Sequence, residues 1–230
     1  MDIRFFKIIL QYSNSILGLA PGNKDNTSTP FIKQLYLNGQ IEEPVISLLV
    51  RQNLTTIGGL DEQNCLTDKT SKVPNLSKTR WIVEANDFEI SYLSKTEKVH
   101  FLIEPDTFLI GVPSSYIKTL IQNKIIVRSD DLINYIYCNT TLIMNFKLNN
   151  QPFLLDVGKY IQTLNISKGK ELCLFPVKPT DYRYNDWPVW QLGVIFFIDY
   201  CCAFNYTDNS LVVSNYKASN LLTSTISINS

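Results

Sequence analysis

The chain has 230 residues, of which 45% are hydrophobic and 18% are charged, and its 21 basic and 21 acidic residues leave no formal net charge. This is the composition of a packed globular protein with a real core. Balanced charge without a basic cluster argues against a polyanion-binding protein, so we expect no nucleic-acid partner. The longest apolar runs, residues 5–10 and 192–198, fall far short of the roughly 20 residues of a membrane-spanning helix.

The first predicted element is a helix that begins at Thr29-Pro30 and ends at Gly39. Thr29 is expected to cap this helix and Pro30 to occupy its first turn. Short apolar runs bounded by turn residues then recur along the chain and predict a mostly β fold. They span residues 45–50, 88–93, 99–103, 142–148, 153–155, 189–198, 201–205 and 211–213. Between the first two runs, the polar stretch from Asp61 to Thr79 is expected to be a surface loop.

A second helix is predicted from Pro113 to about Asn123, with one apolar face. Asn149-Asn150 predicts a tight hairpin, because asparagine tolerates a positive φ, and Asp208-Asn209 predicts another. Trp190 to Ile198 is the most continuously apolar segment. We expect it to be the central strand of a six-stranded type of sheet.

Five cysteines and a single histidine lack the paired short spacings of a zinc site, so we expect no metal and no cofactor. The sequence Asn-x-Ser/Thr, the acceptor for N-linked glycans, occurs at Asn26, Asn53, Asn75, Asn139, Asn165 and Asn205. Together with the odd cysteine count, these candidate sites favour the secretory pathway, ending outside the cell or in a lysosome-like vacuole. The first residues lack the pattern of a signal peptide, so we expect any export signal to lie outside the chain.

The order of motifs resembles one family, the pepsin-like aspartic proteases, and specifically their C-terminal lobe. Residues 15–21 (SILGLAP) resemble that family's G-I-L-G-L motif, and residues 57–61 (IGGLD) resemble its x-G-G-x-D motif. The most specific stretch, residues 190–200 (WQLGVIFFIDY), is similar to W-x-L-G-D-x-F-x-x-x-Y. The resemblance implies a mostly β lobe with two or three short helices.

The resemblance also implies domain boundaries and a disulfide. Residues 15–216 would form the lobe, residues 1–14 would be the end of a missing N-terminal lobe or an inter-lobe segment, and residues 217–230 would be a tail. Cys138 and Cys173 would be paired, as in the loop that this family closes around a hairpin.

Peptide hydrolysis in this family needs two carboxylates that share a proton across a bound water, and each lobe supplies one aspartate in a D-T/S-G-T/S turn. Residues 109–113 (LIGVP) resemble the L-I-x-G-P that follows the second turn. Counting back places Glu104 on the catalytic aspartate and Thr107 on the hydroxyl that anchors the turn, while Pro105 and Asp106 depart from the pattern. A second register places Asp106-Thr107 on D-T, but it needs a two-residue deletion before Pro113 and puts Phe108 in the glycine position.

The first catalytic motif does not occur in the 230 residues. We therefore expect a member of the aspartic endopeptidase family, here a lone C-terminal lobe with a degenerate motif that is inactive by itself. The implied partners are a peptide or protein, as substrate or ligand, and a complementary N-terminal lobe. The alternative is a non-catalytic lobe that binds peptides or proteins, and a third hypothesis is a symmetric dimer of lobes that rebuilds a two-carboxylate site.

Overall fold

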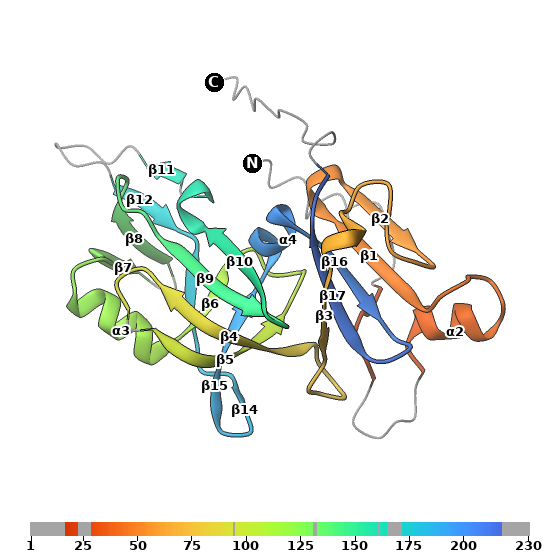
Figure 1. Cartoon of the computed structure of the whole chain (residues 1–230). Helices are drawn as coiled ribbons and strands as arrows, with labels where there is room; N and C mark the ends of the chain where they lie inside the picture. Colours follow the sequence, from red (N-terminus) through yellow and green to blue (C-terminus); the bar gives the residue numbers. More distant parts are fainter. Residues whose placement is uncertain are drawn as a thin grey trace.

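The computed structural model describes residues 17–22, 29–93, 95–130, 133–160, 162–164 and 172–217. Over these residues the chain is mostly β, with three short α-helices and three sheets (Figure 1). The predicted fold class is therefore confirmed. The expected segment 1–14 and all but Lys217 of the expected tail lie outside the described residues.

One sheet has five antiparallel strands in the order β2-β1-β16-β17-β3. Their bounds are Val45–Leu49 for β1, Leu54–Ile57 for β2, Ser71–Pro74 for β3, Tyr200–Asn205 for β16 and Ser210–Asn215 for β17. The predicted turn at Asp208-Asn209 joins β16 to β17, and Asn209 has a φ of 56°. This sheet forms the right-hand part of the molecule in Figure 1.

The second sheet has eight strands, seven of them in the order β10-β9-β4-β5-β15-β6-β13, with β14 paired to β15. Their bounds are Ile82–Ile90 for β4, Thr96–Ile103 for β5, Ile110–Pro113 for β6, Ile143–Leu148 for β9, Gln151–Asp156 for β10, Val177–Thr180 for β13, Arg183–Tyr184 for β14 and Trp187–Leu192 for β15. The predicted hairpin at Asn149-Asn150 joins β9 to β10, with φ values of 46° and 64°.

A third sheet has four strands in the order β11-β12-β8-β7. Their bounds are Arg128–Asp130 for β7, Ile133–Tyr137 for β8, Gln162–Leu164 for β11 and Leu172–Phe175 for β12. Short 3₁₀ helices occupy Val50–Gln52 (η1), Thr67–Lys69 (η2) and Val157–Tyr160 (η3).

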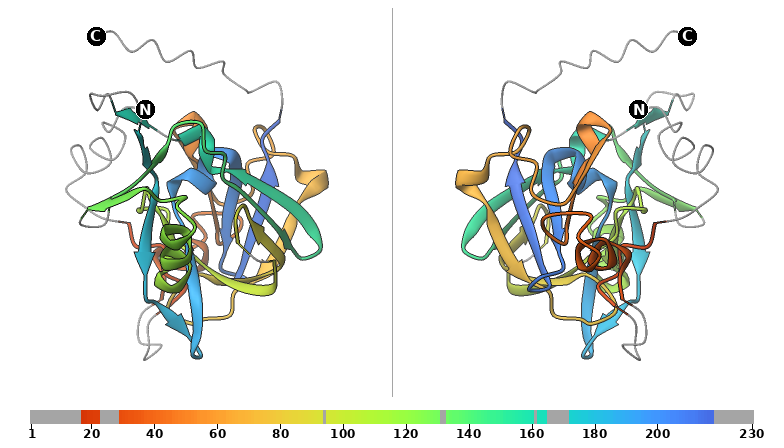
Figure 2. Two further views of the ribbon diagram at one scale, coloured as in Figure 1. Left: turned by 90° about the vertical axis from the view of Figure 1, so that its left-hand side faces the viewer. Right: turned by 90° about the vertical axis from the view of Figure 1, so that its right-hand side faces the viewer.

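Both predicted helices are present, as α2 (Phe31–Leu37) and α3 (Ser114–Gln122). The predicted cap of α2 is wrong, because Pro30 occupies the N-cap position and Thr29 contributes only its carbonyl, which accepts from Gln34 Nε2 at 2.7 Å. Helix α3 buries Ile117 and Leu120 and packs against β6 and β13, as the turned views of Figure 2 show.

The predicted strand from Trp190 to Ile198 is wrong beyond Leu192. The chain leaves β15 at Gly193 and forms the helix α4 (Val194–Asp199). Residues 194–197 are all buried, so the apolar run shows no period that could distinguish a helix from a strand. The expected six-stranded type of sheet is likewise replaced by sheets of five and eight strands. The part that is a strand does lie inside its sheet, between β5 and β6.

The prediction of a surface loop from Asp61 to Thr79 is wrong for much of this stretch. It contains η2 and the edge strand β3, and both Asp61 and Ser71 are buried. Asp61 accepts hydrogen bonds from the Thr56 hydroxyl at 2.8 Å and from the Asn64 backbone N–H at 2.9 Å. A buried carboxylate with such local donors is satisfied, so polar composition does not mark exposure here.

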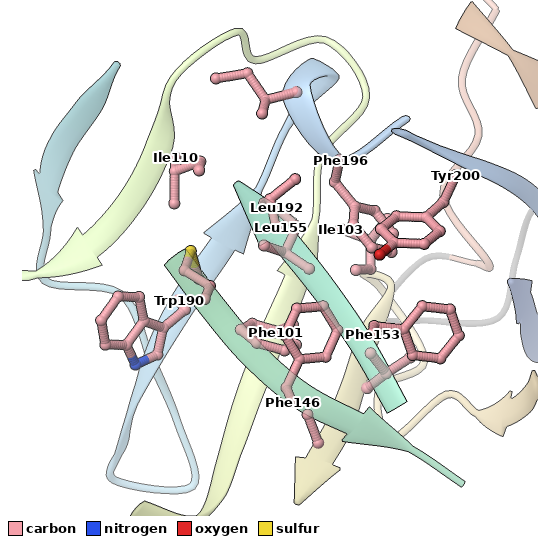
Figure 3. Close-up of a cluster of buried hydrophobic side chains, with 14 of the residues drawn as sticks. Phe101, Ile103, Ile110, Phe146, Phe153, Leu155, Trp190, Leu192, Phe196 and Tyr200 are labelled. Carbon is pink, nitrogen blue, oxygen red and sulfur yellow. The ribbon is translucent and has the colours of Figure 1, made fainter. Parts of the chain in front are cut away.

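One hydrophobic cluster joins the two large sheets into a single core. Trp81 of the segment before β4 lies against Phe204 of β16, with ring centroids 5.0 Å apart. Figure 3 shows the centre of this cluster, where Phe101, Phe146 and Phe153 pack beneath Leu192 and Phe196. A core that spans both sheets means that the described residues behave as one folded unit.

Two disulfides cross-link the fold. Cys138 pairs with Cys173, with Cα atoms 4.9 Å apart, and ties the end of β8 to β12. Cys65 pairs with Cys201 of β16 across 136 residues of sequence, with Cα atoms 6.0 Å apart. Successive side chains of a strand point to opposite faces, so Cys202 faces the main core instead and remains a buried free thiol.

Candidate functional site

The candidate site lies where the connection between two strands crosses the end of a third. Strands β5 and β6 follow each other in sequence, but β15 lies between them, parallel to β5 and antiparallel to β6. The turn Glu104–Thr107 therefore arches over the carboxyl end of β15. Two backbone hydrogen bonds hold it there, from Glu104 N–H to Leu192 O at 3.0 Å and from Val194 N–H to Thr107 O at 2.7 Å.

Gly193 is the residue that lets this crossing form. A Cβ atom added to Gly193 would lie 1.9 Å from Thr107 O and 3.3 Å from Leu109 O, both backbone atoms. Only glycine can therefore follow β15 while the turn stays in contact with it. The close approach of the turn therefore explains why the sequence motif has a glycine at position 193.

Glu104 lies at the end of β5 with its side chain 23% exposed, and its Oε1 accepts from Arg80 Nη1 at 3.2 Å. Burial raises the pKa of the Glu104 carboxyl, and the nearby charge of Asp106 raises it further. Arg80 and Lys178 act in the opposite direction but do not cancel these effects. Glu104 is thus a carboxyl with a raised pKa, contacted by an arginine.

The other motif residues are placed differently. Asp106 is exposed on the same turn, whereas Phe108 is partly buried and packs against the main core. Thr107 takes part in the hydrogen bonds of the described residues through its backbone: its N–H donates to Glu104 O at 3.1 Å, and its carbonyl accepts from Val194. The anchoring of the turn is therefore a main-chain contact.

Sequence reasoning missed Arg80, which contacts Glu104, and Lys178, whose charge lowers the pKa of Glu104. Leu102 of β5, Gln191 of β15, Gly111 of β6 and Lys178 of β13 form one row across neighbouring strands. Gln191 is 9% exposed, and its side chain lies over Gly111, where an added Cβ would fall 2.3 Å from Gln191 Oε1. These contacts join positions far apart in sequence, so no local pattern could have identified them.

Four of the six candidate glycosylation sites fall in the described residues, and Asn26 and Asn165 lie outside them. Asn53 and Asn139 are exposed. Asn75 and Asn205 are half-buried, and Asn205 Oδ1 accepts from the Thr207 backbone N–H at 2.8 Å. The structure therefore separates these asparagines by accessibility.

We predict that Asn75 carries no glycan when the chain is expressed through a secretory pathway, whereas exposed Asn139 can accept one. Asn75 Nδ2, the atom a glycan would modify, donates to Ser77 O at 2.6 Å and Asn209 Oδ1 at 3.2 Å, and Asn75 Oδ1 accepts from Ile82 N–H at 2.8 Å. Asn75→Ala should therefore cost about 1–3 kcal/mol of unfolding free energy, and Asn139→Ala much less. Peptide mass spectrometry and urea unfolding check both parts, and a glycan on Asn75 would contradict the prediction.

Within the described ranges, no group of three or more His, Cys, Asp or Glu side chains could hold a metal ion. The helices of that part of the chain are also too short or too polar to cross a membrane.

Comparison with known proteins finds a distant similarity to a protease. No protein-family model matches the chain. Aspartic protease 1 of Caenorhabditis elegans is 24% identical over 204 residues, an alignment that covers 82% of this chain and 50% of that protein. The chain therefore spans about half the length of this curated relative. This distant similarity, together with the mostly β fold, supports a relationship to an aspartic protease.

Proposed function

We propose that residues 15–216 are the C-terminal lobe of a pepsin-like aspartic endopeptidase scaffold, with Glu104 at the position of the catalytic aspartate. The observation that carries this proposal is the crossing of the Glu104–Thr107 turn over β15, which presents a carboxyl at the end of β5. The distant relationship to an aspartic protease supports it. The register with Glu104 is favoured over that with Asp106, because Glu104 is the partly buried carboxyl and Asp106 is exposed.

We further propose that this lobe does not hydrolyse peptides by itself. The reaction needs one ionised and one protonated carboxyl on either side of a water. Here Glu104 contacts Arg80. The neighbouring carboxyl that raises the pKa of Glu104 is that of Asp106, which belongs to the same turn. Glutamate is also one methylene longer than aspartate, and a displacement of about 1 Å can cost about 10²-fold in rate.

The test is an assay of the purified chain against an unfolded protein substrate, with and without pepstatin. The assay covers about pH 2 to pH 7, because a pair of carboxyls that shares one proton titrates within this range. We expect no pepstatin-sensitive cleavage. An intact pepsin-like enzyme serves as the positive control. Cleavage that is abolished by Glu104→Gln or Asp106→Asn would contradict this proposal and favour a site assembled from two copies.

A second candidate function, peptide or protein binding without catalysis, is favoured by aromatic side chains at the start of β15, the end of that strand away from Glu104. Trp187 is 57% exposed on the tight hairpin of β14 and β15, next to Tyr184 and His100. Exposed tryptophan, tyrosine and arginine dominate protein-binding sites. Titration with a reduced, unfolded polypeptide, followed by tryptophan fluorescence, should show binding that Trp187→Ala weakens, and unchanged fluorescence would exclude this surface.

We also propose a secretory, extracellular or lysosome-like vacuolar location. Its support is the pair of disulfides, since such bonds persist in oxidising compartments. The relationship to an aspartic protease fits the same location.

A further inference from the structure

The side chain that contacts Glu104 is that of Arg80, and the backbone next to Arg80 is fixed to the end of β5. Trp81, the residue after Arg80, accepts a hydrogen bond at its carbonyl from Ile103 N–H at 2.8 Å, and Ile103 precedes Glu104. Trp81 itself is buried in the core. The backbones that carry Arg80 and Glu104 are therefore fixed side by side at the start of β4 and the end of β5.

Tyr182 is the second residue that the Arg80 side chain contacts. The guanidinium carbon of Arg80 lies 5.0 Å from the centre of the Tyr182 ring, which is a cation–π distance. Tyr182 packs against the buried cluster of Ile82, Leu102 and Val189, and its carbonyl accepts from Val189 N–H at 3.1 Å. The Tyr182 ring is thus held in place by its own packing, and the Arg80 guanidinium contacts both this ring and the Glu104 carboxylate.

From this geometry we infer that Arg80 is an internal inhibitory residue. Stacked on Tyr182, it forms an ion pair with the Glu104 carboxylate and so prevents that carboxylate from binding anything else. The inference rests on the proposed function, because it concerns the carboxyl assigned there to the catalytic position. A guanidinium stays charged at every relevant pH, so Arg80 cannot leave by losing a proton. The pair can be broken only by protonating Glu104 or by a ligand that takes its place.

The charges around Glu104 set the direction of this control. Asp106 on the same turn disfavours the ionised carboxyl, while Arg80 before β4 and Lys178 of β13 favour it. The ion pair is present above the pKa of Glu104 and is lost as the pH falls through it. Because burial and Asp106 raise that pKa, the ion pair is lost at a less acidic pH than an ion pair of an ordinary glutamate would be.

The test is a carbon-13 NMR titration of the glutamate side-chain carboxyls, with the Glu104 signal assigned by its loss in Glu104→Gln. The pH range from about 3 to 7 brackets the ordinary glutamate pKa of about 4.3. Arg80→Gln should raise the proton affinity of Glu104 about two- to five-fold, the range expected for a partly exposed ion pair. Tyr182→Leu should raise the proton affinity of Glu104 by less, because Arg80 remains and loses only its contact with the Tyr182 ring.

Arg183→Gln is the matched control, since Arg183 is an exposed arginine nearby whose Nη1 donates to the Asp186 carbonyl at 2.8 Å. It should leave the titration of Glu104 unchanged. If Glu104 has the same pKa in Arg80→Gln as in Arg183→Gln, the inference is overturned. If it has the same pKa in Tyr182→Leu as in Arg183→Gln, the role of the Tyr182 ring is overturned. Circular dichroism confirms that each variant is folded. Cleavage by the unmodified chain would instead defeat the proposed function, so the two failures are distinguishable.

Discussion

Gly193→Ala is expected to destabilise the chain by about 3 kcal/mol or more, the upper part of the range for overpacking a filled site. The added Cβ would lie 1.9 Å from the Thr107 carbonyl oxygen, so the backbone itself must move. That movement would break the hydrogen bond from Val194 N–H to Thr107 O and weaken the one from Glu104 N–H to Leu192 O. Urea unfolding measures the loss of stability, and the Glu104 titration should shift with the displaced turn.

Gly59→Ala is the matched control for this substitution. No atom lies within 4 Å of a Cβ built on Gly59, and its backbone φ is outside the region that favours glycine. Its unfolding free energy should change by less than about 1 kcal/mol, as expected for a Gly→Ala change without strain. Equal losses in the two variants would mean that Gly193 does not support the crossing described here.

Removing the Cys65–Cys201 disulfide is expected to cost more than removing Cys138–Cys173. The first closes a loop with a sequence separation of 136, and the second one of 35. Loop-closure entropy then predicts losses of about 5 and about 4 kcal/mol. Cys65 and Cys201 also pack with Leu49 and Tyr216, so Cys65→Ala/Cys201→Ala loses buried contacts as well. Urea unfolding of the two double variants under identical conditions tests the order, and a smaller loss for the longer loop would contradict it.

Turns and short helices could be read from the sequence because their causes are local. Asn149-Asn150 and Asn209 adopt the positive φ that asparagine tolerates. The helix before Gly39 ends where expected, since Gly39 has a φ of 68°. In these places, the preferences of one or two residues decide the conformation.

Tertiary packing decided the segment that follows Trp190. An unbroken apolar run is compatible with a strand or a helix when every side is buried. Strand β15 ends at Leu192 because the turn from β5 to β6 lies across its end, and the chain after Gly193 has to leave the sheet as α4. The turn that forces this change lies about 85 residues earlier in the sequence, beyond the reach of any local pattern.

The sequence by itself led to the candidate residues, because the resemblance of residues 109–113 to a family motif pointed to Glu104, Asp106 and Thr107, and a second motif marked Gly193. The catalytic position of Glu104 stays a prediction. It also contained the cysteine spacing of the loop that Cys138 and Cys173 close. Only the tertiary structure decided the environment of the carboxyl. Arg80 contacts Glu104, Tyr182 lies against Arg80, and the charge of Lys178 lowers the pKa of Glu104, although the three residues lie in separate parts of the sequence. Charge, burial and stacking depend on distances in space, and these are set by sheet order rather than by spacing along the chain.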